Sequence, residues 1–477
     1  MRISQRLRAR SVDVLVVVAA ASVFACTNDE TAPLLPIPGA ARHDVTPTVT
    51  VANTNDAGAG SLRQAIADAV AGDVIGFDAS IAGQTITLTT GELEIAKALT
   101  IQGPSTSGIT IRGGGTSRVL EVTALESTDQ ITLRNLTITG GNIVGLGGGI
   151  FKKNSSSLTI DHVLVAGNTG ETGGGIDSEQ GQLTIINSTI SGNTARSTIA
   201  ASVFGGGIAS SGDLAITSST VVNNVALGGA ATFALAAGIY SHGAKAAQYR
   251  NDIIAGNTTD NGSGAHSDNC QSESSPKPIL VGVNLSDDAS CGAAGAHVLI
   301  ADPQLGALAS NGGPTQTMAL LRTSPAIDAV SLSDCTVTTD QRYVSRPQGI
   351  ACDIGAFEFN AFDQTPLSID GSVAVNPSTG VAVVTGIISC PEAISLTIHV
   401  ALSQPQKTGR VNTTVSAADD LILTCNGTKA WGIALTPATG GFQNGSGSVK
   451  ASTTNRAPYV LPASASASVK MFWGHQP

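Results

Sequence analysis

Short runs of alternating aliphatic and polar residues make up most of this chain, and between residues 147 and 257 the runs repeat. A cluster of small residues ending in isoleucine occurs four times, at 147–150, 173–176, 205–208 and 236–239. A strand-like segment ending in asparagine follows each cluster, at 158–168, 183–193, 214–224 and 247–257. The segment keeps its length while the connection to the next cluster varies, which is typical of a solenoid of stacked coils.

The alternation also predicts which side chains are buried. Leu183, Ile185 and Ile190 alternate with polar residues, as in strands that bury one face. We expect such aliphatic residues to point inward and to stack from coil to coil about 4.8 Å apart, so that Leu158, Leu183 and Leu214 form one row. The period of 25 to 33 residues excludes a left-handed helix built on hexapeptides. The pattern predicts an all-β fold, a single-stranded parallel β-helix over residues 47–300.

The asparagines that end the four segments are Asn168, Asn193, Asn224 and Asn257. We expect them to be structural turn residues whose side chains bond one another and neighbouring backbone. The alternative is a polar row that binds a ligand. The glycine clusters are expected to supply positive φ angles. They lack the lysine and the strand-to-helix context of a phosphate-binding loop.

An amphipathic helix is predicted just before the repeats. Leu62, Ile66, Ala69 and Val70 share one helical face, with Ser61 as N-cap and Gly72 as the stop. Such a helix would cover the first coil, which otherwise exposes apolar residues and strand edges.

The first 26 residues are predicted to be a lipoprotein-type signal peptide. Four arginines precede an apolar run over 14–25, which is too short to span a bilayer. The run ends VFAC, so Cys26 is the predicted lipidation site and the lipid the predicted contact with a membrane. An ordinary signal peptide cleaved near a cysteine is the alternative. Residues 27–46, with three prolines, read as a tether.

The composition limits the cell compartments and the classes of partner that fit this chain. Charged residues make up 13 % of the 477 residues and the net charge is −10, which argues against a nucleic-acid partner. Setting Cys26 aside, six cysteines remain in neighbouring couples, and nearest-neighbour pairing is one of fifteen connectivities. Disulfides would indicate an oxidising compartment. The predicted pairs are Cys270 with Cys291, Cys335 with Cys352, and Cys390 with Cys425.

A different pattern begins near residue 363. Six or seven period-two segments separated by turns continue to residue 477 and predict a β-sandwich accessory domain. Trp431 is a candidate core residue. The region resembles the Ig-like accessory domains of bacterial surface proteins, whose fold alone does not decide whether they space or bind.

Several motifs carry a more specific resemblance. SLRQAIADAVAGDVIGFD (61–78), TITLTTGELEIAKALTIQGP (85–104) and the GGGI copies resemble exported bacterial right-handed parallel β-helix proteins with the pectate-lyase-like fold. Related repeats occur in the chlamydial polymorphic outer-membrane proteins. Residues 302–329 and 338–359, with NGGPTQT, SPAIDA, RPQG and CDIGAFE in order, are similar to the choice-of-anchor Q region. The resemblance implies a cell-surface or secreted protein and a closing region over 301–360, but it transfers no catalytic residue.

Residues 301–360 also make sense as a cap on physical grounds. Asp328, Asp340, Arg342 and Arg346 are expected to form buried ion pairs, and Cys335 with Cys352 would staple the last loops.

Enzymes on this fold need specific constellations of charged residues. A hydrolase needs aspartates on adjacent coils, whereas a lyase needs a calcium-binding carboxylate cluster and a base. Asp161-His162 aligns with Ile186-Asn187 and Thr217-Ser218 of sister copies and is therefore an ordinary repeat position. The other candidates are isolated: Asp287-Asp288, Asp419-Asp420, Asp260, Tyr249-Arg250 and Lys152-Lys153.

We therefore predict no catalytic residue, no metal site and no cofactor, with calcium required only if the chain is a lyase. The leading hypothesis is a non-catalytic protein of the outer membrane or cell surface, lipid-anchored or else secreted. It would act as an adhesin or stalk whose partner is a polysaccharide or another surface component. The alternative is a polysaccharide lyase or glycoside hydrolase. The apolar loops 194–204 and 225–235 would, if exposed, form a patch for a partner or for self-association.

Overall fold

The computed structural model describes residues 45–473 with internal gaps, so Cys26, the signal segment and most of the tether lie outside the described residues. The gaps are residues 198–201, 229–232, 243–245, 263, 274–276, 296, 361–366, 409–410 and 456–463. Side chains at 389–394, 408, 411, 426–427 and 454–455 lie outside the description as well.

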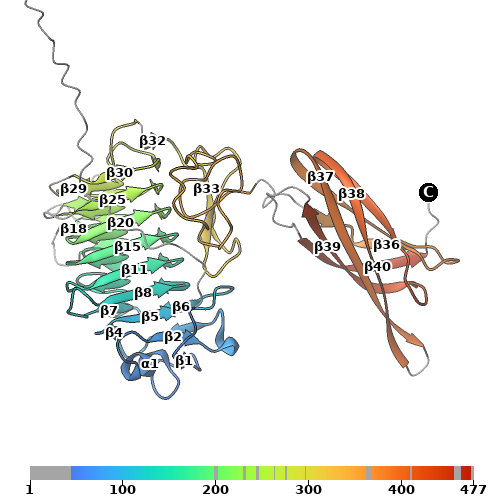
Figure 1. Cartoon of the computed structure of the whole chain (residues 1–477), viewed down its shortest axis with the longest axis horizontal. Helices are drawn as coiled ribbons and strands as arrows, with labels where there is room; N and C mark the ends of the chain where they lie inside the picture. The colour runs from blue at the N-terminus through green and yellow to red at the C-terminus, as the bar shows by residue number, and fades with distance from the viewer. Residues whose placement is uncertain are drawn as a thin grey trace, which may run out of the picture. The chain divides into compact units, whose positions relative to one another are not determined.

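Residues 49–300 form a right-handed parallel β-helix, as predicted, in which three parallel sheets run along the stack of coils (Figure 1). Sheet 1 contains β1 (Val49–Val51), β2 (Val74–Phe77), β5 (Leu99–Gln102), β8 (Gln130–Arg134), β11 (Ser157–Asp161), β15 (Gln182–Ile186), β20 (Asp213–Thr217), β25 (Ala247–Arg250) and β30 (Ile279–Val281). Sheet 2 contains β4 (Leu93–Ile95), β7 (Leu120–Val122), β10 (Ile150–Lys152), β14 (Ile176–Ser178), β19 (Ile208–Ser210), β24 (Ile239–Ser241) and β29 (Cys270–Ser272). Sheet 3 contains β3 (Thr85–Thr87), β6 (Ile109–Arg112), β9 (Leu136–Thr139), β12 (Leu164–Ala166), β16 (Thr189–Ser191), β21 (Thr220–Val222), β26 (Ile253–Ala255), β31 (Asn284–Ser286) and β32 (Val298–Ile300).

The inward rows follow the alternation in the sequence. Leu158, Leu183 and Leu214 are direct partners in successive strands, and all three are fully buried. One continuous core of aliphatic residues extends from Val51 to Cys270. Each buried aliphatic side chain contributes about 2 kcal/mol, so every coil that stacks on the last adds to the stability of the fold.

A single residue in the left-handed conformation turns the chain from sheet 1 to sheet 3 in five successive coils. These residues have φ between 45° and 57°, and they are Asn135, His162, Asn187, Ser218 and Asn251. Asparagine tolerates this conformation better than most residues do. The Asp161-His162 pair is therefore a repeat position, as its alignment with the sister copies indicated.

The predicted asparagines form a ladder of buried side chains on the opposite turn. The Oδ1 of Asn193 accepts from the backbone N (3.1 Å) and from Nδ2 (3.0 Å) of Asn168, and Asn224 and Asn257 repeat the pattern. Asn269, which the repeat pattern did not identify, continues the ladder beyond Asn257.

The third small residue of each cluster explains why the ladder needs glycine. A Cβ added at Gly175 would lie 2.6 Å from the carbonyl oxygen of Gly207 in the next coil and 3.0 Å from the amide group of Asn193, and Gly207 meets Gly238 and Asn224 in the same way. Such contacts are too close for any other side chain. The asparagine and the glycine cluster are therefore two halves of one packing unit.

The predicted helix is α1 (Leu62–Asp68), whose N-cap Ser61 accepts a hydrogen bond from the backbone N of Gln64. Leu62 and Ile66 are buried against the first coils. The helix ends before Gly72, because Ala69 already has extended dihedral angles. Val70, which we placed on the apolar face, is 67 % exposed, so that assignment is wrong.

Shorter strands join the loops beside sheet 2. They are β13 (Thr169–Gly170), β17 (Thr194–Arg196), β22 (Val225–Leu227), β27 (Thr258–Asp260) and β28 (Ala265–Ser267), with β18 (Val203–Phe204) and β23 (Ala234–Leu235) pairing separately. Ala195, Val203, Ala226 and Ala234 bury one another. The described part of these apolar loops therefore packs internally and forms no continuous exposed patch, although Phe233 is 70 % exposed.

Residues 301–360, here called the strap, lie along the flank of the β-helix, where we had expected a closing region at the last coil. The strap includes a hairpin of β33 (Leu305–Ala309) and β34 (Thr317–Leu320) beside the coils (Figure 1). Gly355 N donates to Asn251 O (2.8 Å), whereas Tyr343, several coils away, donates to Asn135 Oδ1 (2.7 Å). The strap therefore runs back along the column of single-residue turns.

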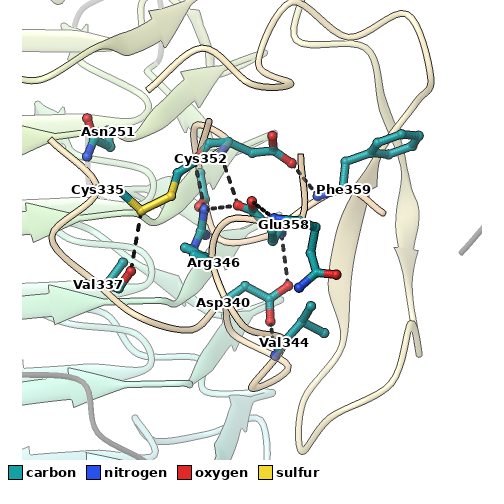
Figure 2. A network of polar contacts seen from close by, with 12 residues as sticks. Asn251, Cys335, Val337, Asp340, Val344, Arg346, Cys352, Glu358 and Phe359 are labelled. Carbon is teal, nitrogen blue, oxygen red and sulfur yellow. Dashed lines mark hydrogen bonds and ion pairs between the residues drawn. A yellow bond between two sulfur atoms is a disulfide. The ribbon is translucent and has the colours of Figure 1, made fainter. Parts of the chain in front are cut away.

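The strap is fixed from within by a network of buried charges (Figure 2). Arg346 Nη1 lies 2.7 Å from Glu358 Oε2, and both side chains are almost fully buried. Asp340 pairs with Arg342 at 2.8 Å and accepts from the backbone N of Glu358. Three of the four expected charged residues thus form ion pairs, but Glu358 is the partner that sequence reasoning missed. Asp328 instead accepts from the backbone N of Ala351.

Two of the predicted disulfides are present. Cys270–Cys291 joins β29 to the loop after β31, and Cys335–Cys352 lies inside the strap. Cys425 is also disulfide-bonded. The side chain of Cys390 lies outside the described residues, so the third pairing stays a prediction.

Residues 367–473 form a separate, sandwich-like region with a mainly antiparallel sheet. Its strands are β35 (Leu367–Ile369), β36 (Ser372–Val375), β37 (Ala382–Thr408), β38 (Val411–Leu435), β39 (Gly445–Asn455) and β40 (Ser464–Trp473). Trp431 is buried in its core, as predicted, over Gly386, where a Cβ would lie 2.6 Å from the indole ring.

Replacing a ladder residue should destabilise the β-helix. Asn193→Ala removes an acceptor for two donors of Asn168 and two donated bonds, to Val165 O and Asn224 Oδ1. Each buried group left unsatisfied costs about 1–3 kcal/mol, so the free energy of unfolding should fall by about 3 kcal/mol or more in urea titrations. Asn142→Ala, at an exposed asparagine, is the control and should change it little. Equal effects of the two substitutions would contradict a structural role for the ladder.

Breaking the buried pair should loosen the strap. Arg346→Met leaves the Glu358 carboxylate buried without its counter-charge, at a cost of about 3–5 kcal/mol. Limited proteolysis should then cleave within 301–360 faster than in the unaltered chain. Arg196→Met, at an exposed arginine of the β-helix, is the matched control. Unchanged cleavage in Arg346→Met would show that the pair does not hold the strap.

Candidate functional site

The middle residue of each sheet 2 strand points away from the core and forms an outward column. Adjacent strands pair these residues directly. The column consists of Glu94, Glu121, Phe151, Asp177, Ala209, Tyr240 and Gln271. Because the preceding isoleucine or leucine points inward, period-two alternation places the next residue outside. We call this surface the sheet 2 face.

Arg118 anchors the end of the sheet 2 face nearest the N-terminal coils. Its Nη1 lies 3.0 Å from Glu92 Oε1 and 3.7 Å from Glu121 Oε2. Its guanidinium carbon lies 5.0 Å from the centre of the Phe151 ring, within the range of a cation–π contact. Burial raises the pKa of Glu92, with the positive charge of Arg118 opposing the shift. The cluster therefore combines one cation, two carboxyls and an aromatic ring.

Asp177 is the most unusual residue of the sheet 2 face. The residue is 5 % exposed, and among the described residues no hydrogen bond reaches its carboxyl group. Burial raises its pKa well above the ordinary range, nearby Glu179 adds to the shift, and Arg118 opposes it. Burial of this kind favours the protonated form of a carboxyl group. In that form the group can donate a hydrogen bond as well as accept one.

Aromatic side chains occupy the other end of the face. The rings of Phe204 and Tyr240 stack with centres 4.7 Å apart, and His242 lies 5.4 Å from Tyr240. Burial raises the pKa of Tyr240 to about 12, and the Glu273 carboxylate adds to the effect. Its hydroxyl group therefore stays protonated and polar at physiological pH.

The carboxylates near the last coils serve turns. Asp287 accepts from Asn269 Nδ2 (2.6 Å) at the end of the asparagine ladder, and Asp288 accepts from Ser267 Oγ (2.7 Å). Asp260 accepts from the backbone N of Gly262 (2.7 Å). These contacts explain the positions of all three aspartates without a ligand.

Two further candidate pairs lie apart from the sheet 2 face. Asp420 of the sandwich-like region makes an exposed pair with His399 at 2.6 Å, while Asp419 accepts from its backbone N. Asp161 contacts His162 (2.5 Å) and Arg134 (2.9 Å). Burial alone would raise the pKa of Asp161, but these two neighbours lower it overall. Both contacts fix local structure.

The remaining candidates are interior or isolated. Tyr249 is fully buried inside the coils, so it lines no surface, and Arg250 is also buried. Lys152 points inward and donates to the carbonyl groups of Asn154 (2.7 Å) and Gln180. Burial lowers the pKa of Lys152 to about 8. Its neighbour Lys153 is exposed.

Among the described residues, no group of three or more His, Cys, Asp or Glu side chains is arranged to hold a metal ion. The helices within the described ranges are all too short or too polar to cross a bilayer.

Sequence reasoning missed Arg118, Phe151 and Asp177 as site residues. A usable signal was present, because Phe151 and Asp177 each directly follow the isoleucine of a GGGI cluster. Alternation alone places such residues outside the coil. What it could not show is that neighbouring coils and loops bury them.

Comparisons with known proteins identify no family for this chain. No protein-family model and no curated protein matches the chain. Among solved structures, the enzymatically active domain of tailspike protein 4 from bacteriophage CBA120 is similar, with 12 % sequence identity and a TM-score of 0.17. The match covers 78 % of this chain and 61 % of the tailspike chain, less than two thirds of its length. The fold assignment therefore rests on the strand pairing itself.

The raised pKa of Asp177 predicts a pH-dependent stability. The folded state holds this proton more tightly than the unfolded chain does, so the contribution of this carboxyl group to stability is greatest below about pH 4 and falls as the pH rises through the folded pKa. Asp177→Asn removes this dependence. Its thermal midpoint, relative to that of the unaltered chain, should increase steadily from pH 4 to pH 8. Glu126→Gln, at an exposed carboxyl, should show no such trend. If the thermal midpoints of Asp177→Asn and of the unaltered chain differ by the same amount at every pH, the Asp177 carboxyl group titrates normally.

Proposed function

We propose that this chain is a polysaccharide-binding protein of the bacterial cell envelope, which contacts its ligand along the sheet 2 face. The observation that carries the proposal is the outward column in which Asp177, buried and without a hydrogen-bond partner among the described residues, lies between Phe151 and Ala209. A carboxyl group in this state gains most from a ligand that supplies hydroxyl groups.

The geometry of the face suits a polymer. The column follows the direction of coil stacking, and its seven strands span roughly 30 Å at about 4.8 Å per step. An extended glycan laid along the column would meet Arg118 and its carboxylates at one end and Tyr240 at the other. Repeating sugar units would thus face repeating strands.

Other parts of the chain support a place outside the cytoplasm. Two disulfides are expected in an oxidising compartment. The N-terminal pattern supports export, with Cys26 as the lipid attachment site on an outer-membrane or cell-surface protein. The motifs of residues 302–359 support kinship with the choice-of-anchor Q proteins. The sandwich-like region would then act as an accessory domain of a stalk or adhesin.

A second candidate, an inverting glycoside hydrolase, is favoured by one observation. Asp177 and Glu121 lie two strands apart in the column, so their backbones are about 10 Å apart. Inverting hydrolases place the carboxyl groups of an acid with a raised pKa and of a base roughly 6.5–9.5 Å apart, a range that two carboxyl side chains on backbones about 10 Å apart can reach. Asp177 would be the acid and Glu121 the base. A calcium-dependent lyase has less support, since the described residues include no metal-binding cluster.

Binding and turnover should be measured together on the purified full chain. Affinity electrophoresis in gels containing pectate, alginate, xylan or glucan should show retardation by at least one polymer. Asp177→Ala should weaken that retardation about tenfold or more, because one buried hydrogen bond and its supporting shape are lost. Glu126→Gln, away from the face, should bind as the unaltered chain does.

The same incubations distinguish the candidate activities. We expect no increase in reducing ends and no ultraviolet absorbance from unsaturated products, with or without added calcium. Reducing ends that vanish in Asp177→Asn and in Glu121→Gln would establish the hydrolase. Unsaturated products would establish a lyase. If no polymer slows migration, the sheet 2 face is not a polysaccharide-binding surface.

A further inference from the structure

A concave surface lies on another side of the β-helix, between sheet 3 and the strap. Its floor is formed by β6, β9 and β12, and its wall by strap residues 308–316. The volume is about 680 Å³, which falls within the range of small-ligand sites. We call it the hydroxyl groove, after the residues that line it: Thr106, Ser107, Thr110, Thr137, Thr139, Ser310 and Thr315.

The floor presents hydroxyl groups at regular spacing. Thr110 and Thr137 are direct partners in adjacent strands, about 4.8 Å apart, and Thr139 lies two residues further along β9. All three side chains are half-buried. Among the described residues, none of their hydroxyl groups has a hydrogen-bond partner, so each one is free to bond a ligand.

The wall, itself part of the strap, is held in place by contacts with another strap residue and with the β-helix. Thr315 Oγ1 accepts from Gln341 Nε2 (2.8 Å), and Gln341 in turn accepts from Thr189 of sheet 3 (2.6 Å). Gly108 approaches Pro314 so closely that a Cβ would lie 2.3 Å from its carbonyl oxygen. Floor and wall are therefore joined by direct contact, and the groove keeps its form without a ligand.

The chemistry of the lining selects the class of ligand. No charged side chain lines the hydroxyl groove, and Leu164, Leu308 and Pro314 add small apolar surfaces. A neutral, hydroxyl-rich molecule satisfies both features, because it exchanges hydrogen bonds with threonine and lays its C–H faces on the aliphatic groups. A polyanion gains no counter-charge here, and the net charge of the chain, −10, opposes its approach.

We propose that the hydroxyl groove is a binding site for neutral oligosaccharides, separate from the sheet 2 face. Thr110, Thr137 and Thr139 would bond the sugar hydroxyl groups, and the strap would form the opposite wall. The chain would thus contact glycans on two sides, with a charged face for one ligand and a neutral groove for another.

Calorimetric titration of the purified full chain with cellohexaose, maltohexaose, mannohexaose and hexagalacturonate tests the proposal. At least one neutral hexasaccharide should bind saturably, and hexagalacturonate should not compete with it. Thr137→Val keeps the shape and the strand preference of the residue but removes the hydroxyl group. It should weaken neutral binding about three- to tenfold. Thr50→Val, an exposed threonine on sheet 1, is the matched control and should bind normally.

Asp177→Asn separates this site from the sheet 2 face. Neutral binding should survive that substitution unchanged, and hydrogen exchange of residues 308–316 should slow when the neutral sugar is bound. The proposal is overturned if no neutral hexasaccharide binds. It is equally overturned if Thr137→Val and Thr50→Val bind alike, or if Asp177→Asn abolishes the binding.

Discussion

The register between successive coils is the constraint on which the rest of this structure depends. Buried asparagines hold that register by accepting hydrogen bonds from the backbone and the side chain of the preceding coil, and they do so where glycine leaves room for the amide. A strand shifted by one residue would turn every inward aliphatic side chain outward. Because the ladder prevents that shift, the outward positions of sheets 2 and 3 also form straight columns. The sheet 2 face from Phe151 onward follows from this alignment.

The strap adds a second layer of organisation. Its charges are buried away from solvent, and Arg346 satisfies Glu358 while bonding the carbonyl groups of Asp353 and Gly355. Burial raises the pKa of Asp353 to about 8, with the nearby Glu358 adding to the shift. Such a network needs every member, so it specifies one path for this segment along the turn column. That path gives sheet 3 the wall of its groove, and the contacts of the strap lie along the turns between sheets 1 and 3.

The repeating hydrophobic pattern predicted the coils because each repeat shows the same alternation of aliphatic and polar residues and the same final asparagine. The equivalent positions of Leu158, Leu183 and Leu214 in the repeats predict a row of inward side chains. The asparagine that ends each segment predicts a stacked turn. The strap's location was beyond reach, because contacts such as Tyr343 with Asn135 join residues with no local pattern in common. The same holds for Asp177, since its outward direction follows from alternation, whereas its burial and the nearby charge of Arg118 do not. Glu358 was missed because nothing near it in the sequence marks Arg346 as its partner.

The state of the Asp177 carboxyl group is the most direct test of the sheet 2 face. Carbon-13 labelling of aspartate carboxyl groups, followed by an NMR titration and assigned through Asp177→Asn, reports its ionisation in the folded chain. We expect a carboxyl signal that titrates well above the ordinary aspartate range and shifts when the polysaccharide is added. A signal that titrates near pH 4 and does not shift when the polysaccharide is added would contradict the proposed role of the sheet 2 face.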